Sequence, residues 1–177
     1  MKRSTQINAL LLLSYLLGLA SAAVAEPECN NGASMNIVAH EDDDFLFLSP
    51  DLIHDIQSGR CVRTVFVTAG DADLGLPYSN SRVKGVRSAY ARMAHVSSAW
   101  TISDAFISGH AIPIHTLRSH SKISLVFLKL PDGNFDGNGF SNNNYQSLRK
   151  LLAGTISDIR TIDGSNRFTK AACRALL

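Results

Sequence analysis

Residues 35–68 read MNIVAHEDDDFLFLSPDLIHDIQSGRCVRTVFVT, and the pattern of this segment indicates the fold class. Residues 35–39 predict a short strand, and residues 49–59 predict a helix. Residues 61–68 are mostly β-branched and apolar, which is typical of a strand buried on both faces. A strand, a helix and a strand in this order predict a βαβ unit, and therefore a parallel sheet.

The rest of the chain continues the alternation of helices and strands. In the first helix, Ser49 is the expected N-cap, Pro50 suits the first helical position, and Gly59 suits the end. We find no internal repeat and no linker that would divide residues 26–177, so we expect one domain. The further predicted elements are a helix at 81–94, one or two strands within 100–117, a strand at 123–130, a helix at 144–152 stopped by Gly154, and an uncapped helix from near Thr169.

Acidic turns follow three of the predicted strands. They comprise residues 40–44, 70–73 and 132–136. In an open parallel sheet, ligands bind at the carboxyl ends of the strands. If these strands are neighbours, the three turns converge on one cleft.

The turn after the first strand carries His40, Glu41 and three aspartates in succession. Imidazole and carboxylate together suit Zn²⁺ and related divalent ions, and a cation would relieve the repulsion between the acids. Residues three apart in such a turn can both reach one ion. His40 and Asp43 are therefore the candidate ligands, with Asp42 as a general base. The alternative is a solvated acidic loop that caps the next helix.

Four segments in order resemble one enzyme family. They are AHEDDD at residues 39–44, TVFVTAGDA at 64–72, Arg82 with YARMA at 90–94, and LKLPDG at 128–133. These segments resemble the motifs of the PIG-L (LmbE-like) de-N-acetylase family, whose members commonly show A-H-P-D-D-E or A-H-x-D-D-D after the first strand. The resemblance extends over nearly all of residues 35–177.

The resemblance implies an α/β fold: a Rossmann-like three-layer sandwich with a mainly parallel sheet. It also implies a zinc-dependent hydrolase that removes an N-acetyl group from a substrate containing N-acetylglucosamine, such as N-acetylglucosaminylphosphatidylinositol. By matching position, His40 and Asp43 are expected to bind one Zn²⁺ and Asp42 to act as the base. The residues expected to contact this amino-sugar or glycolipid substrate are Arg82, Asp71 and Asp132.

The chain departs from the family pattern in three places. Glu41 replaces the usual proline, which is tolerable because that side chain need not touch the metal. Val83 and Lys84 stand where the family commonly has an acid after the arginine. The third zinc ligand of the family comes from an H-x-x-H-type segment that would lie beyond Leu177. We therefore expect either a chain that lacks its C-terminal part, with Phe168 left exposed on the last helix, or a relative that lost the chemistry.

The first 25 residues resemble a secretory signal peptide. Lys2 and Arg3 precede an apolar run that ends in Ala23-Val24-Ala25. We therefore expect a secreted protein comprising residues 26–177; the alternative is a membrane anchor. No second apolar run is long enough to span a membrane.

The composition of the chain excludes some classes of partner. The sequence has 17 basic and 15 acidic residues, with two of the basic ones in the signal peptide, so no excess of positive charge favours nucleic-acid binding. Three cysteines, Cys29, Cys61 and Cys173, allow one disulfide without fixing which two pair. The sequence leaves the oligomeric state open.

Several alternatives remain open at this point. Residues 132–137 match the start of a calcium-binding loop, although Asn143 stands where a bidentate glutamate is needed. His110, His115 and His120 are candidates for a further metal ligand, but surface or hydrogen-bonded roles are commoner for such residues. The acid cluster also suits a Mg²⁺-dependent phosphohydrolase. A secreted, non-catalytic carbohydrate-binding relative is the remaining alternative.

Overall fold

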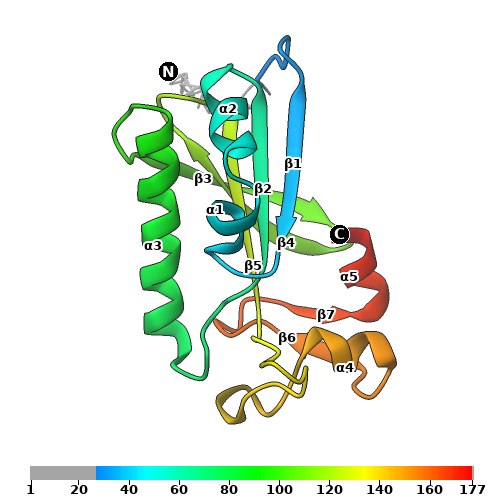
Figure 1. The fold of residues 1–177 in the computed structure, drawn as a ribbon. Coiled ribbons are helices and arrows are strands. Elements are labelled where there is room, and N and C mark those ends of the chain that lie inside the picture. Colours follow the sequence, from blue (N-terminus) through cyan, green and yellow to red (C-terminus); the bar gives the residue numbers. More distant parts are fainter. Residues whose placement is uncertain (1–26, 177) are drawn as a thin grey trace, which may run out of the picture.

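A computed structural model describes residues 27–176, and its centre is a five-stranded sheet in the order β1-β2-β5-β4-β3 (Figure 1). The expected signal peptide lies outside the described residues. The fold is α/β, as predicted. The strands are β1 (Ala33–Val38), β2 (Cys61–Thr68), β5 (Ile123–Leu130), β4 (His110–Leu117) and β3 (Trp100–Ile107).

The sheet is mixed, so the predicted parallel arrangement holds for only part of it. β1, β2 and β5 run parallel to one another, whereas β4 pairs antiparallel with both β5 and β3. Ser108 and Gly109 form a two-residue turn with positive φ at both positions, which reverses the chain between β3 and β4. Residues 118–122 then connect β4 to β5, and five residues are too few for a parallel crossover.

Helices and a small hairpin cover the two faces of this sheet. The first face carries α1 (Asp43–Phe47), α2 (Asp51–Gln57) and α3 (Gly75–Met93). The second face carries α4 (Leu148–Ala153), the antiparallel strands β6 (Asp158–Arg160) and β7 (Arg167–Thr169), and α5 (Lys170–Leu176); a 3₁₀ turn, η1 (Ser141–Asn143), precedes α4. In Figure 1 the second group gathers at the carboxyl end of the parallel strands.

Each face of the sheet has its own apolar core. Alternate residues of β2 point to opposite sides, with Val62 and Phe66 packed under α2 and α3, and Val65 and Val67 packed on the other face. Phe66 stacks on Phe127 of β5 with ring centroids 5.0 Å apart. Because β2 contributes side chains to both cores, residues 61–68 are apolar on both faces of the strand.

The C-terminal segment closes the second core. Phe168 is only 1 % exposed and Cys173 is 2 % exposed, so the expectation that Phe168 lies bare on the surface is wrong. Thr169 Oγ1 accepts a hydrogen bond from the amide of Ala172, so the prediction that the last helix is uncapped is wrong. β6 and β7 escaped prediction because each is only three residues long.

Helix boundaries differ from the predictions for local reasons. α2 begins at Asp51 without a side-chain cap, so the capping role predicted for Ser49 is wrong; the Ser49–Pro50 peptide bond is cis. α3 begins earlier than predicted because Pro77 lies in its first turn, where proline costs no helical hydrogen bond. α4 starts later because Ser147 caps it through the amide of Lys150.

A disulfide joins Cys29 to Cys61 and so ties the chain before β1 to the start of β2. Cys173 is a free, buried cysteine. Within residues 27–176, no helix combines the length and the apolar composition needed to span a bilayer.

Candidate functional site

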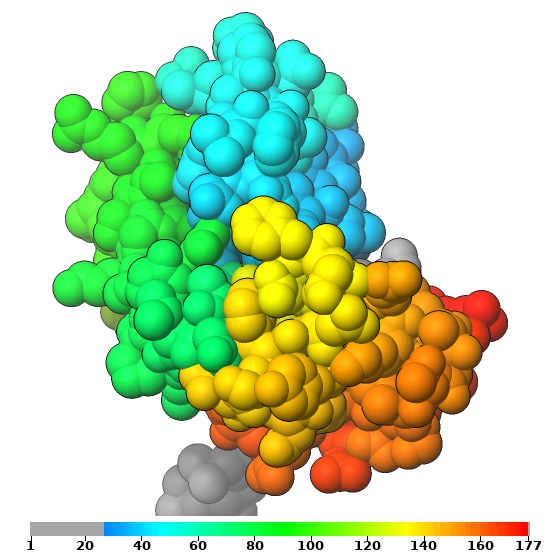
Figure 2. Space-filling model, turned by 60° about the horizontal axis from the view of Figure 1, so that its bottom comes forward, coloured from blue at the N-terminus to red at the C-terminus, as the bar shows by residue number. Residues whose placement is uncertain are grey.

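The three acidic turns meet at the carboxyl edge of β1, β2 and β5, as predicted. Nε2 of His40, after β1, lies 3.6 Å from Oδ1 of Asp132, after β5. The amide of Asp132 lies 3.4 Å from the carboxylate of Asp71, after β2. Figure 2 brings this edge forward: the yellow segment after β5 lies against the cyan segment of α1 and the green segment before α3. The parallel order of these three strands produces this meeting.

His40 lies between two carboxylates, one at each ring nitrogen. Nδ1 is 3.7 Å from Oδ2 of Asp43, and Nε2 faces Asp132. The close approach of Asp132 raises the pKa of His40 above its ordinary value, although partial burial acts in the opposite direction. The same contact lowers the pKa of Asp132. The ring is therefore oriented from both sides.

Backbone amides hold the carboxylate of Asp43. Its Oδ2 accepts hydrogen bonds from the amides of Ala39 (3.1 Å) and His40 (2.9 Å). Ala39 is itself fixed, because its carbonyl accepts from both the amide and the hydroxyl of Thr68 at the end of β2. The positions of His40 and Asp43 thus follow from the β1–β2 pairing.

The donor chemistry of this pair fits zinc. In a tetrahedral zinc site, neighbouring donor atoms lie about 3.4 Å apart, close to the separation of His40 Nδ1 and Asp43 Oδ2. The Asp132 carboxylate at the other ring nitrogen corresponds to the outer partner that usually orients a metal-binding histidine. Within residues 27–176, no three histidine, cysteine, aspartate or glutamate side chains gather around one point as a metal site.

Asp42 lies beside this pair and is held by Arg82 of α3. Arg82 Nη2 donates to Asp42 Oδ1 at 2.7 Å, and Nη1 donates to the carbonyl of Gly70 at 3.2 Å. The Asp42 side chain is 56 % exposed, the most open of the acids in this turn that form an ion pair. The Arg82 guanidinium therefore binds other groups of the protein. The predicted contact of Arg82 with substrate stays a prediction.

Glu41 is buried beneath this ion pair. Its side chain is 1 % exposed, and Oε2 lies 3.3 Å from Arg82 Nε without the alignment of a hydrogen bond. Burial raises the pKa of Glu41 to about 7. The residue that departs from the family pattern therefore points away from Asp43 and into the contact with α3.

Gly70 makes this arrangement possible. Its φ is +50°, and a Cβ there would stand 2.5 Å from Glu41 Oε2 and 3.1 Å from the Arg82 guanidinium carbon. Any side chain at this position would meet both the left-handed backbone penalty and the buried ion pair. The glycine in the TVFVTAGDA segment at residues 64–72 is therefore required for steric reasons.

A buried hydrogen-bonded chain anchors α1 under the site. The carboxylate of Asp44, which is fully buried, accepts from the hydroxyl of Tyr90 at 2.8 Å. The Tyr90 hydroxyl also lies 2.7 Å from Thr64 Oγ1, which accepts from Asn36 Nδ2. Burial raises the pKa of Asp44, and the bond from Tyr90 opposes that rise. This chain links β1, β2, α1 and α3 and fixes the turn that carries His40.

Asp71 is fully buried and bridges two loops. Its Oδ1 accepts from the amide of Asp132, and its Oδ2 accepts from Asn143 Nδ2 at 3.0 Å. The neighbouring Asp73 accepts from the amide of Asn142. The substrate contact predicted for Asp71 is untested, and its surroundings favour a role in positioning Asp132.

The other candidate ligands lie in different surroundings. His110 packs against Phe168 on the second face, and His115 packs edge-on against Phe127. His120 lies in the connection before β5, at the opposite end of the sheet from His40. In the candidate calcium loop, Asp132 accepts from the amide of Asn134, and both oxygens of Asp136 accept from Asn138. These carboxylate oxygens therefore accept hydrogen bonds from donors within the same loop.

Two residues of the site, Tyr90 and Asn143, were not predicted from the sequence. Tyr90 was noted only as the first residue of the YARMA segment, and nothing local in the sequence reveals that its hydroxyl meets Asp44. Asn143 was read only as a poor calcium ligand, although it fixes Asp71.

Comparisons of the chain with protein-family models, with curated proteins and with solved structures found no match. The resemblance to the PIG-L family therefore stays a prediction.

Proposed function

We propose that this protein is a zinc-dependent hydrolase that removes an N-acetyl group from an N-acetylglucosamine-containing substrate. The observation that carries the proposal is the meeting of His40, Asp43 and Asp132 at the carboxyl edge of the sheet, with Asp42 exposed beside them. The two covered faces of the sheet support the Rossmann-like three-layer arrangement implied by the resemblance. The Cys29–Cys61 disulfide is compatible with secretion.

His40 and Asp43 would hold the metal. The chemistry that zinc supplies at such a site is polarisation of a carbonyl group and activation of water. Asp132 would keep the His40 ring in one orientation and one tautomer through the nitrogen that faces away from Asp43. The amides of Ala39 and His40 would keep the Asp43 carboxylate in place.

Asp42 is the proposed general base. Its carboxylate takes a proton from the attacking water, and the same proton then passes to the amine nitrogen as the amide C–N bond breaks. The products are acetate and the free amino sugar, so atoms balance with water as the only co-reactant. Arg82 holds Asp42 at 2.7 Å and so acts as a positioning residue for this step.

The proposal is tested by measuring acetate release from N-acetylglucosaminylphosphatidylinositol in the presence of Zn²⁺. Asp42→Asn should lower turnover by roughly two to four orders of magnitude. Asp104→Asn, which makes the same change on an exposed position of β3, should leave turnover unchanged. Equal turnover in wild type and Asp42→Asn would contradict the role of Asp42.

The same assay separates the alternative functions. A Mg²⁺-dependent phosphohydrolase would release phosphate from a sugar phosphate and prefer Mg²⁺ to Zn²⁺. A non-catalytic carbohydrate-binding protein would release neither acetate nor phosphate while still binding the sugar. The histidine at the centre of the site favours zinc over magnesium, since Mg²⁺ is bound mainly by oxygen.

A further inference from the structure

A groove of about 470 Å³ crosses the second face of the sheet at the amino end of the parallel strands. Its walls include Met35 of β1, Arg63 of β2, Ser124 at the start of β5 and Ile114 of β4. The hairpin and helices that cover this face lie over the other, carboxyl, half of the sheet (Figure 1). The groove is therefore separate from the His40 edge in both face and end, and its volume is that of a small-molecule site.

The charge of the groove has one sign. Arg63 and Lys122 line it, and none of its lining residues is acidic. Lys122 Nζ donates to the carbonyl of Gly59, which places its charge at the rim. In a partly enclosed groove, two cations without a facing acid favour an anionic ligand.

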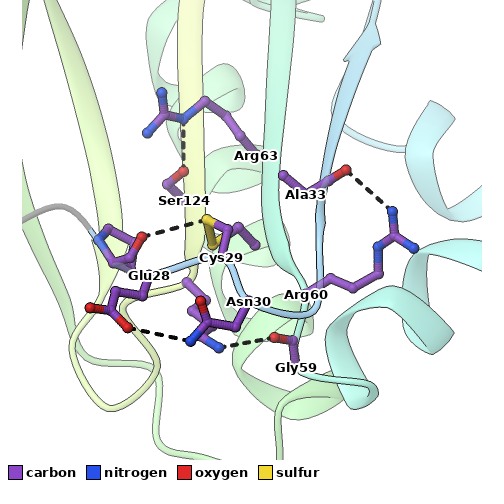
Figure 3. The surroundings of a disulfide bond; sticks show 11 residues. Glu28, Cys29, Asn30, Ala33, Gly59, Arg60, Arg63 and Ser124 are labelled. Carbon is purple, nitrogen blue, oxygen red and sulfur yellow. Dashed lines mark hydrogen bonds between the residues drawn. A yellow bond between two sulfur atoms is a disulfide. The ribbon is translucent and has the colours of Figure 1, made fainter.

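The Arg63 guanidinium is oriented for such a ligand. Its Nε donates to Ser124 Oγ at 2.9 Å. Figure 3 shows Arg63 and Ser124 on neighbouring strands beside the disulfide, with neither terminal guanidinium nitrogen in a drawn hydrogen bond. Within residues 27–176, those two nitrogens have no hydrogen-bond or ion-pair partner. A guanidinium with both terminal nitrogens available matches the two oxygens of a carboxylate.

Ser124 adds a second donor. It is 6 % exposed, and its oxygen already accepts from Arg63. Its own hydrogen has no acceptor among the described residues. A buried hydroxyl in this state is completed by an acceptor from the groove.

Apolar surface lies next to these donors. Met35 is 60 % exposed, and Ile114 and the Cys29–Cys61 disulfide line the same groove. Burying this surface favours a ligand with a hydrocarbon body. We propose that the groove binds a small amphipathic organic anion, whose carboxylate meets Arg63 and Ser124 and whose apolar body covers Met35 and Ile114. This site is independent of the proposed hydrolase activity.

The test is calorimetric titration of the purified protein with decanoate below its micelle-forming concentration. Decyl maltoside and decyltrimethylammonium are the neutral and cationic counterparts with the same chain. Decanoate should bind with one molecule per chain and at least tenfold more tightly than either counterpart. Arg63→Gln should weaken decanoate at least tenfold and leave decyl maltoside unchanged. Arg92→Gln, which removes the same charge from an exposed position on α3, should bind decanoate as wild type does.

A second variant tests the groove while Arg63 is left unchanged. Ser103→Asp places a carboxylate on the exposed wall of the groove, on edge strand β3, and should also weaken decanoate at least tenfold. Wild-type decanoate affinity in either variant would overturn the proposal, as would equal affinity for the three decyl compounds. Sedimentation showing a dimer that decanoate does not dissociate would assign the groove to a second copy instead.

Discussion

The two ends of the parallel strands are held together by different means. At the carboxyl end, the charges are dense and are paired with one another or with backbone amides, as in the contacts of Arg82 with Asp42 and of Asp43 with two amides. At the amino end, a disulfide joins the chain before β1 to the start of β2, and Arg63 has no acidic partner among the described residues.

This difference means that the two ends of the parallel strands respond differently to substitution. The disulfide acts mainly on the unfolded chain, so the amino end can leave an open groove without losing its geometry. The carboxyl end depends on a buried polar chain and on a close backbone approach, both of which fail if a single partner is removed. Changes at the amino end should therefore alter stability, and changes at the carboxyl end should alter both stability and the site.

The largest expected effect is at the amino end. The double variant Cys29→Ser/Cys61→Ser opens a loop of 32 residues and should lower the free energy of unfolding by about 3–4 kcal/mol. Urea unfolding with and without reductant measures this loss. Reductant should destabilise the wild type and leave the double variant unaffected; a wild type insensitive to reductant would show that the bond contributes nothing.

The next effect tests the close approach at the carboxyl end. Gly70→Ala should cost about 2 kcal/mol from its left-handed backbone, and in addition should displace Glu41 and Arg82. Gly154→Ala is the matched control, because its φ is +76° and nothing lies within 4 Å of the added Cβ. Thermal unfolding of both variants measures the difference. Equal losses would show that the contact with Glu41 has no energetic consequence.

A smaller effect is expected from the buried polar chain. Tyr90→Phe leaves Oδ2 of the buried Asp44 without its donor, while Oδ1 keeps the amide of Phe45, and should cost about 1–3 kcal/mol. Tyr145→Phe removes a hydroxyl from a side chain that is 57 % exposed and should be neutral. Chemical denaturation of both variants checks this, and a neutral Tyr90→Phe would remove the chain from the account of how α1 is held.

Much of the fold was predictable because its signals are local. The apolar runs of β2 and β5 and the acids that follow β1, β2 and β5 identified the parallel core and the edge where His40 lies. The antiparallel half of the sheet was missed, although the short connection at residues 118–122 already excludes a parallel crossover.

The contacts inside the site were harder to predict because they join distant segments. Glu41 meets Arg82, and Tyr90 meets Asp44 across 46 residues of sequence. No hydrophobic period or motif spacing encodes such a pair. Arg82 was likewise expected to contact substrate, because a sequence motif identifies a residue but does not show which groups its side chain binds.

A separate effect is a pH dependence at His115, which lies away from both ends of the parallel strands. Burial, with Arg87 and Lys129 nearby, lowers the pKa of His115 from 6.5 to about 4. As pH falls below 6.5, the unfolded chain takes up this proton before the folded protein does. The contribution of His115 to the free energy of unfolding therefore falls between pH 6.5 and about 4. Below about pH 4 this contribution no longer changes with pH. Unfolding measured across this range should show a shallower loss in His115→Leu than in the wild type.

The control for this pH dependence is His54→Leu, on the exposed side of α2. It should keep the slope of the wild type. Identical slopes in wild type and His115→Leu would contradict the burial of a neutral His115.

The zinc content of the purified protein shows whether His40 and Asp43 bind the metal. Metal content is measured on purified wild type, His40→Ala, Asp43→Ala and Asp42→Asn after dialysis against trace Zn²⁺. We expect zinc to be bound by wild type and Asp42→Asn and to be lost from His40→Ala and Asp43→Ala, because only the latter two remove proposed ligands. One zinc per chain in both His40→Ala and Asp43→Ala would contradict the assignment.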